Sequence, residues 1–172
     1  MRYLPEAVEE LWFKPVIWLV PLFWWNLSLK ERVIVFGRKW FLSVTLGLIM
    51  AATYFLLFRR FNLTNIQWTW DLAGVGIATA VTEELVFSGF VMGYMEKLKK
   101  SRWVSLVTVA VLVMTVRLPI LLFVYRLGWK ELSGALLLTG ATGAINAWIR
   151  AETGSAVGSI LARMGMNLAI LG

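Results

Sequence analysis

The feature that most constrains this chain of 172 residues is a series of apolar runs long enough to cross a lipid bilayer. A membrane-spanning helix needs about 17–25 mostly apolar residues, and four runs of this length cover residues 40–58, 72–95, 103–125 and 132–149. A fifth run, over residues 154–171, is interrupted only by Arg163 and Asn167, and we expect it to span with these polar groups turned inward. A shorter run over residues 16–29 contains Pro21 and three tryptophans, so it either crosses the membrane or lies at its surface.

The composition excludes a soluble enzyme. Hydrophobic residues make up 59% of the chain and charged residues only 16%, so there is too little polar surface to cover a water-facing globule of this size. The chain also has no cysteine and no histidine, which excludes disulfides, thiolate nucleophiles, His-ligated metals and Ser-His-Asp triads. Any catalysis would therefore depend on carboxylates or hydroxyls.

The net charge of +7 comes from short clusters of Lys and Arg between the apolar runs. Such clusters are typical of membrane flanks rather than of a nucleic-acid surface, so no nucleic-acid partner is expected. The segment Met1–Glu10 carries three glutamates and lacks the basic start of a signal peptide, so we expect no removable leader. We expect a multi-pass integral membrane protein, surrounded by lipid and located in the plasma membrane.

No internal repeat and no long linker divides the chain, which predicts one integral membrane domain over residues 1–172. Its expected fold class is all-α, a polytopic bundle of about five to six membrane helices. Residues 1–39 would form an interfacial or first membrane segment.

Four charged residues fall inside the predicted spans, where each charge costs upward of about 2.5 kcal/mol. They are Glu83, Glu84, Arg117 and Arg163. Ser88 lies one helical turn beyond Glu84, and Asn167 one turn beyond Arg163, so each pair shares a helix face. Pro119, two residues after Arg117, predicts a local kink. Together these features indicate a polar pocket at membrane depth.

Two interpretations of this pocket stay open on residue chemistry alone. In the first, two Glu and two Arg form a neutral network of ion pairs that holds the bundle together. In the second, one Glu is a general base that activates water, and the cations and Asn167 stabilise an oxyanion. Asn146, late in the fourth run, could bond to a neighbouring helix or line the cavity.

Three short motifs carry a resemblance to a known family. The run Thr82-Glu83-Glu84-Leu85-Val86-Phe87-Ser88-Gly89-Phe90 resembles a motif Glu-Glu-x-x-x-Arg, and residues 153–167 resemble a Thr-Gly-Ser opening followed by His-x-x-x-Asn. Between them, residues 113–117 fall where a motif Phe-x-x-x-His is expected. The order and spacing are those of the CPBP family, the CAAX proteases and bacteriocin-processing intramembrane proteases. The resemblance implies a CPBP-like helical core over residues 72–172 and an intramembrane endopeptidase activity.

Every motif is altered. Ser88 stands in place of the family's Arg, and Arg117 and Arg163 in place of its two His, while Glu83, Glu84 and Asn167 match. By resemblance, Glu83 would be the catalytic base, Glu84 its neighbour and Asn167 an oxyanion donor. Arg cannot inherit the histidine role, because it stays protonated and neither accepts nor shuttles a proton. We expect no metal or other cofactor, because two carboxylates and one amide beside two fixed cations make a poor cation site.

These substitutions predict that Arg117 and Arg163 pair with Glu83 and Glu84 across helices, within about 4 Å. If the protein cuts, the reaction is carboxylate-promoted hydrolysis of a membrane-embedded or prenylated peptide, with the arginines as electrostatic substitutes for His. A second hypothesis is a non-catalytic relative that binds membrane peptides or partner helices in the same cavity. A third, a small ion or proton transporter using the two glutamates, is disfavoured because the arginines would block cation passage.

Overall fold

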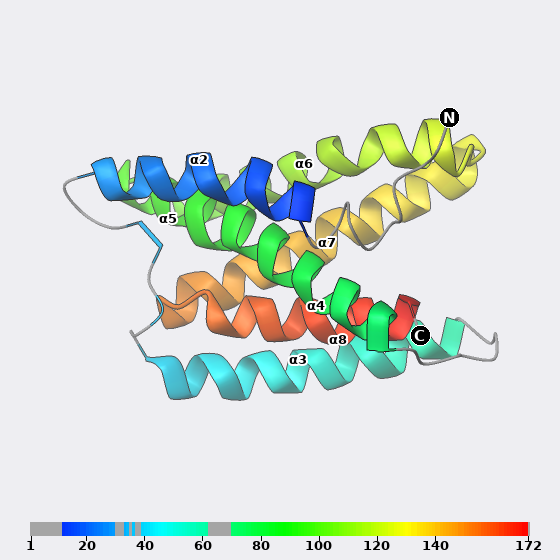
Figure 1. The fold of residues 1–172 in the computed structure, drawn as a ribbon, viewed down its shortest axis with the longest axis horizontal. Coiled ribbons are helices and arrows are strands. Elements are labelled where there is room, and N and C mark those ends of the chain that lie inside the picture. The colour runs from blue at the N-terminus through cyan, green and yellow to red at the C-terminus, as the bar shows by residue number, and fades with distance from the viewer. Residues whose placement is uncertain (1–11, 30–32, 35, 37–38, 62–69, 172) are drawn as a thin grey trace.

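The computed structural model describes residues 12–29, 33–34, 36, 39–61 and 70–171. The segment Met1–Glu10, for which we expected no leader character, lies outside the described residues. All regular structure in the described ranges is helical, which confirms the all-α fold class. The helices are α2 (Lys14–Ser28), α3 (Trp40–Phe61), α4 (Trp70–Glu84), α5 (Met92–Lys97), α6 (Arg102–Pro119), α7 (Trp129–Thr153) and α8 (Val157–Leu171) (Figure 1). Two π-helical segments, η2 (Leu85–Val91) and η3 (Ile120–Val124), continue α4 into α5 and extend α6.

Four of the expected spans are present as long apolar helices. Among the described residues, the helices able to cross a membrane by length and composition cover Trp40–Arg60, Leu72–Lys97, Arg102–Val124 and Trp129–Thr153. The fifth expected span is the 15-residue α8, which at 1.5 Å per residue is about 22 Å long and shorter than the bilayer core of about 30 Å. Its Arg163 and Asn167 are buried, as expected of a helix that turns its polar groups inward.

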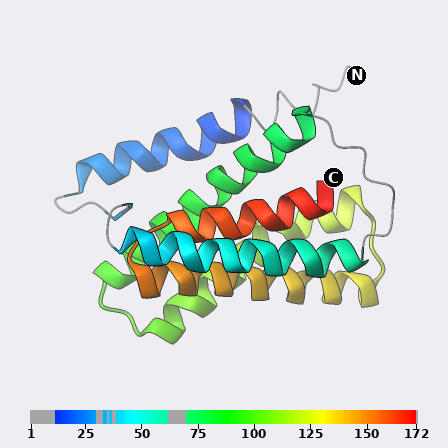
Figure 2. The same ribbon diagram turned by 90° about the horizontal axis from the view of Figure 1, so that it is seen from below.

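Helices α3 and α8 pack closely because small residues face each other along their contact. The two helices lie side by side in both views (Figures 1 and 2). A methyl group on Gly47 would come within 2.6 Å of the Gly158 carbonyl oxygen, and one on Gly165 within 2.7 Å of the Ala51 carbonyl carbon. These distances are too short for any side chain. Gly158 and Gly165 of α8 therefore let the backbones of the two helices approach closely.

The turn between α7 and α8 is held by short hydroxyl side chains. Gly154 ends α7 in the left-handed conformation, with φ 66°, which only glycine adopts without strain. Ser43 of α3 accepts a hydrogen bond from the Gly158 backbone N–H at 2.8 Å, and Thr153 donates to the Ile149 carbonyl at 2.8 Å. Ser155 donates to the Phe36 carbonyl at 2.9 Å. The Thr-Gly-Ser opening of the last motif thus fixes where α8 begins and how it meets α3.

Helix α4 occupies the middle of the bundle. In both ribbon views it runs obliquely between α2 on one side and α8 with α3 on the other (Figures 1 and 2). Its last residues are Glu83 and Glu84, which therefore face packed neighbours on several sides. Helix α2 carries Pro21 and is largely exposed along its length. It covers α4 and η2 from the outside.

Candidate functional site

Three cations from three helices converge on the carboxylate of Glu83. Nη2 of Arg117 on α6 lies 2.5 Å from Oε1 and 2.7 Å from Oε2 of Glu83. Nη2 of Arg163 on α8 donates to Oε2 at 2.5 Å, and Nζ of Lys14 on α2 donates to Oε1 at 3.1 Å. We call Glu83, Arg117, Arg163 and Lys14 the ion cluster. It ties α2, α6 and α8 to the end of α4.

The members of the ion cluster differ in burial. The side chain of Arg163 is 3% exposed and that of Glu83 6%, whereas Lys14 is 17% and Arg117 31% exposed. Arg163 is therefore the least exposed cation of the cluster, and its charge depends most on its partner. Lys14 and Arg117 have long, flexible side chains, and part of each side chain is exposed.

Glu84 has neutral partners. Its Oε2 accepts a hydrogen bond from Ser88 Oγ at 2.5 Å and its Oε1 accepts one from Asn146 Nδ2 at 2.7 Å. Asn146 in turn accepts from the Tyr54 hydroxyl at 3.4 Å. Within the described residues Glu84 has no ion pair, so the expectation that an arginine would serve it is wrong. The reason is geometric: adjacent residues point about 100° apart on a helix, and both arginines lie on the side of Glu83.

Asn167, the expected oxyanion donor, does not contact either carboxylate. Its Nδ2 donates to the Gly76 carbonyl on α4 at 3.0 Å, which secures α8 against α4. Arg163, four residues earlier, also directs Nη1 toward the Met166 sulfur at 3.8 Å. The shared helix face expected for Arg163 and Asn167 thus meets α4, with the ion pair and the amide bond on successive turns.

Sequence reasoning missed the site roles of Lys14 and Tyr54 and left that of Asn146 open. Lys14 lies at the start of α2, and the sequence does not show that this helix folds back over α4. Asn146 was recognisable as a polar residue within an apolar run. Its partner could not be chosen without the packing of α7, which places it opposite Glu84.

Both site helices change winding beside the ion cluster. Helix α4 passes into the π-helical η2 directly after Glu84, and Ser88 lies in that segment. Helix α6 ends at Pro119 and continues as the π-helical η3, so the irregularity expected from this proline is present two residues after Arg117. Such π segments occur often at functional sites, because the extra residue per turn re-aims side chains.

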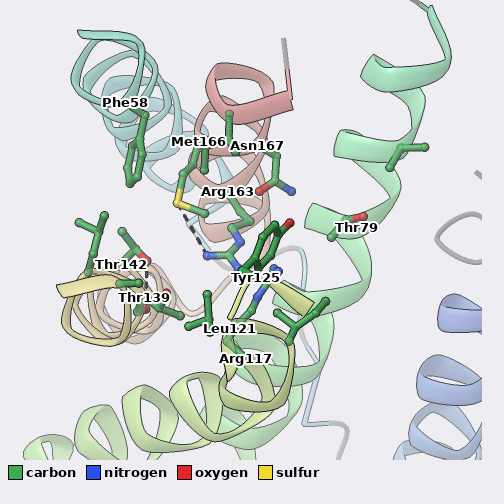
Figure 3. A pocket seen from close by; sticks show the side chains of 15 residues that line it. Phe58, Thr79, Arg117, Leu121, Tyr125, Thr139, Thr142, Arg163, Met166 and Asn167 are labelled. Atoms are coloured by element: carbon green, nitrogen blue, oxygen red, sulfur yellow. Dashed lines mark hydrogen bonds between the residues drawn. The ribbon is translucent and has the colours of Figure 1, made fainter. Parts of the chain in front are cut away.

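Two cavities flank the ion cluster, and Arg117 lines both. The first has a volume of about 290 Å³, and its walls come from α2, α4, α6 and η3; we call it the outer groove, lined by Phe13, Lys14, Ile17, Trp18, Glu83, Val116, Arg117 and Ile120. The second, also of about 290 Å³, contains Arg163 and Asn167 at its wall and does not reach Glu83. We call it the inner cavity (Figure 3).

Comparison with known proteins gives one family. A family model described as "Type II CAAX prenyl endopeptidase Rce1-like" matches residues 65–169. Comparisons with curated proteins and with solved structures give no match. The matched segment holds all three motifs and runs from before α4 to near the end of α8, so it covers more than half of the chain. The chain therefore belongs to the Rce1-like family of CAAX prenyl endopeptidases, within the CPBP group that its motifs resemble.

Proposed function

We propose that this protein is a non-hydrolytic member of its family that binds a membrane-embedded peptide in the outer groove, in the plasma membrane. The observation that carries the proposal is the occupation of both Glu83 oxygens by Arg117, Arg163 and Lys14. Family membership supports a peptide that resides in the membrane, and the ion cluster supports binding without cleavage.

A general base needs a free lone pair directed at the proton it removes. A carboxylate offers about four lone-pair positions, and Glu83 accepts four short contacts from cations. Water would have to displace a guanidinium or ammonium group before it could donate a proton to this carboxylate. Glu84 is buried and accepts hydrogen bonds on both oxygens. The same cations disfavour an ion relay through the two glutamates.

The outer groove has the chemistry of a peptide site inside lipid. Phe13, Ile17 and Val116 are exposed at its walls, where apolar side chains of a bound peptide can pack. Lys14, Glu83 and Arg117 supply charged groups at its base. A peptide backbone in the bilayer core must find hydrogen-bond partners, and the partly exposed guanidinium group of Arg117 can donate to its carbonyl oxygens.

The test uses the full chain in lipid nanodiscs with a fluorescent farnesylated peptide. Anisotropy reports binding, and mass spectrometry of the same samples reports cleavage. We expect saturable binding and an intact peptide. Cleavage that disappears in Glu83→Gln would overturn the proposal, and so would the absence of binding.

Matched variants on α2 locate the site. Ile17 lines the outer groove and Val20 does not, and both are exposed on the same helix. Ile17→Trp should fill the groove and weaken binding by about tenfold, the equivalent of about 1.4 kcal/mol. Val20→Trp should leave binding unchanged, and equal effects of the two variants would contradict a site in the groove.

A further inference from the structure

We propose that a cavity between α6 and α7 binds an anionic phospholipid, with one acyl chain in the cavity and the phosphate against the turn that joins α5 to α6. We call this cavity the α6–α7 groove, and residues 97–102 the basic turn. The groove shares no lining residue with the outer groove or the inner cavity. The proposal therefore does not depend on the peptide site proposed above.

The α6–α7 groove has the size and the wall of a site for an apolar chain. Its volume is about 480 Å³, which lies within the range of roughly 300–1,000 Å³ for small-molecule sites. Both helices are long and apolar enough to cross a membrane, so the groove faces the lipid chains. Arg102 is the one charged residue among those that line it, and the others are Trp103, Leu106, Ala144, Ile145 and Trp148.

One end of the groove lies at the depth of the lipid headgroups. Arg102 at the start of α6 forms an ion pair with Glu152 in the last turn of α7. The exposed Trp103 and Trp148 lie slightly further into these two helices, and tryptophan concentrates at the membrane–water interface. A lipid could therefore keep its phosphate in the headgroup layer while its chain occupies the groove.

The basic turn concentrates positive charge at this end of the groove. It lies beside the end of α7 (Figure 2). Four exposed cations fall within its six residues, Lys97, Lys99, Lys100 and Arg102. The neighbouring carboxylates of Glu96 and Glu152 form ion pairs with Arg150 and Arg102, and no ion pair joins the three lysines to another described residue. Clusters of Lys and Arg beside a membrane helix attract anionic headgroups.

The distribution of charge along α6 favours an anionic lipid over a zwitterionic one. The turn at the other end of α6 has two cations, Arg126 and Lys130, against the four of the basic turn. By the positive-inside rule the end with more cations faces the cytoplasm, where the leaflet carries the anionic lipids. A zwitterionic headgroup would add an ammonium group among the lysines, whereas an anionic headgroup adds only negative charge.

The test measures the thermal stability of the full chain in neutral detergent at low, constant ionic strength. Phosphatidylglycerol is compared with phosphatidylcholine of the same acyl chains, and with glycerol 3-phosphate, which has the charge without the chains. Phosphatidylglycerol should raise Tm by about 5 °C or more near saturation, because a ligand that binds only the folded state stabilises it. No rise, or an equal rise with phosphatidylcholine or with glycerol 3-phosphate, would overturn the proposal.

Charge variants assign the headgroup to the basic turn. Lys99→Gln/Lys100→Gln should remove most of the difference in Tm between the two lipids. Arg126→Gln/Lys130→Gln at the other end of α6 is the matched control and should retain it. Each pair removes two exposed cations and includes one residue with positive φ, 52° at Lys99 and 50° at Arg126. Equal responses of the two double variants would contradict a headgroup site at the basic turn.

A pair of substitutions on α7 assigns the chain to the α6–α7 groove. Ala144 lines this groove, whereas Ala135 lines the inner cavity. Ala144→Phe should reduce the Tm rise with phosphatidylglycerol, and Ala135→Phe should leave it unchanged. A full response in a folded Ala144→Phe protein would refute the assignment. Should this variant fail to fold, the lysine variants still test the proposal, because they change only exposed side chains.

Discussion

Glu83 and Arg117 are joined through both carboxylate oxygens, because Nη2 of Arg117 lies 2.5 Å from Oε1 and 2.7 Å from Oε2. The residue that the family resemblance makes a base is thus the acceptor of an ion pair between α4 and α6. Arg163 and Lys14 complete the same cluster. A site built in this way stabilises helix packing at the point where the family motif would bind water.

Replacing Glu83 by Gln should strongly destabilise the protein. Arg163, buried at 3% exposure, would then lose its carboxylate partner, and an orphaned buried charge costs about 3–5 kcal/mol. The double variant with Arg163→Gln should recover most of this loss, and the double variant with Arg117→Gln less, since Arg117 is partly exposed. Thermal denaturation in detergent measures all four proteins. A parent-like Glu83→Gln variant would show that the cluster does not hold the fold.

The cations of the cluster should differ in their contribution according to burial. Lys14 is partly exposed and its contact with Glu83 is 3.1 Å long, whereas Arg163 is enclosed and contacts Glu83 at 2.5 Å. Lys14→Met should therefore lower the free energy of unfolding by about 1 kcal/mol or less. Arg163→Met should lower it by more, about 1.5–3 kcal/mol, because it removes a charge-assisted hydrogen bond to a buried carboxylate that still keeps Arg117 and Lys14. Chemical denaturation compares the two variants, and an equal loss would contradict the ranking.

The hydrogen bond that Asn146 donates to Glu84 should contribute more to the stability of the protein than the one that Asn146 accepts from Tyr54. Asn146→Ala removes the donor of a 2.7 Å bond to a buried carboxylate, and an unsatisfied charged acceptor costs upward of about 1–3 kcal/mol. Tyr54→Phe removes only a 3.4 Å bond between neutral groups and should cost about 0.5–1.5 kcal/mol. The midpoint of thermal unfolding tests the order, and a larger loss in Tyr54→Phe would reverse our assignment.

Much of the fold could be predicted because a bilayer imposes strong rules on sequence. Length and hydropathy predicted the four long helices of this membrane protein, and they agree with the structure within a few residues at most ends. The inward turn of Arg163 and Asn167 followed from the same rule, since lipid cannot solvate these groups. The π-helical winding after Glu84 was not predictable, because no residue in that segment demands it.

Most residues of the candidate site could be predicted from the sequence, but which of them form ion pairs could be predicted only in part. Burial and charge pointed to Glu83, Arg117 and Arg163 as neighbours, and each arginine has a nitrogen within 2.7 Å of a Glu83 oxygen. The choice between Glu83 and Glu84 as partner depends on helix rotation, which the sequence does not define. Lys14 was missed because its approach depends on where α2 packs, a long-range contact without a local signal.

The contact between α3 and α8 gives the sharpest packing prediction. A methyl group on Gly158 would lie 2.7 Å from Ile149 Cγ2 and 2.8 Å from Ser43 Oγ, and it would overlap the Ser43 carbonyl oxygen. Because the carbonyl belongs to the helix backbone, α3 and α8 would have to separate, at an expected cost of about 1–3 kcal/mol.

Gly134→Ala is the matched control, since nothing lies within 4 Å of a methyl group there, and it should be neutral or stabilising by up to about 1 kcal/mol. Thermal unfolding of Gly158→Ala and Gly134→Ala in the same detergent measures the difference. A Gly158→Ala protein as stable as the parent would contradict the close packing of these helices.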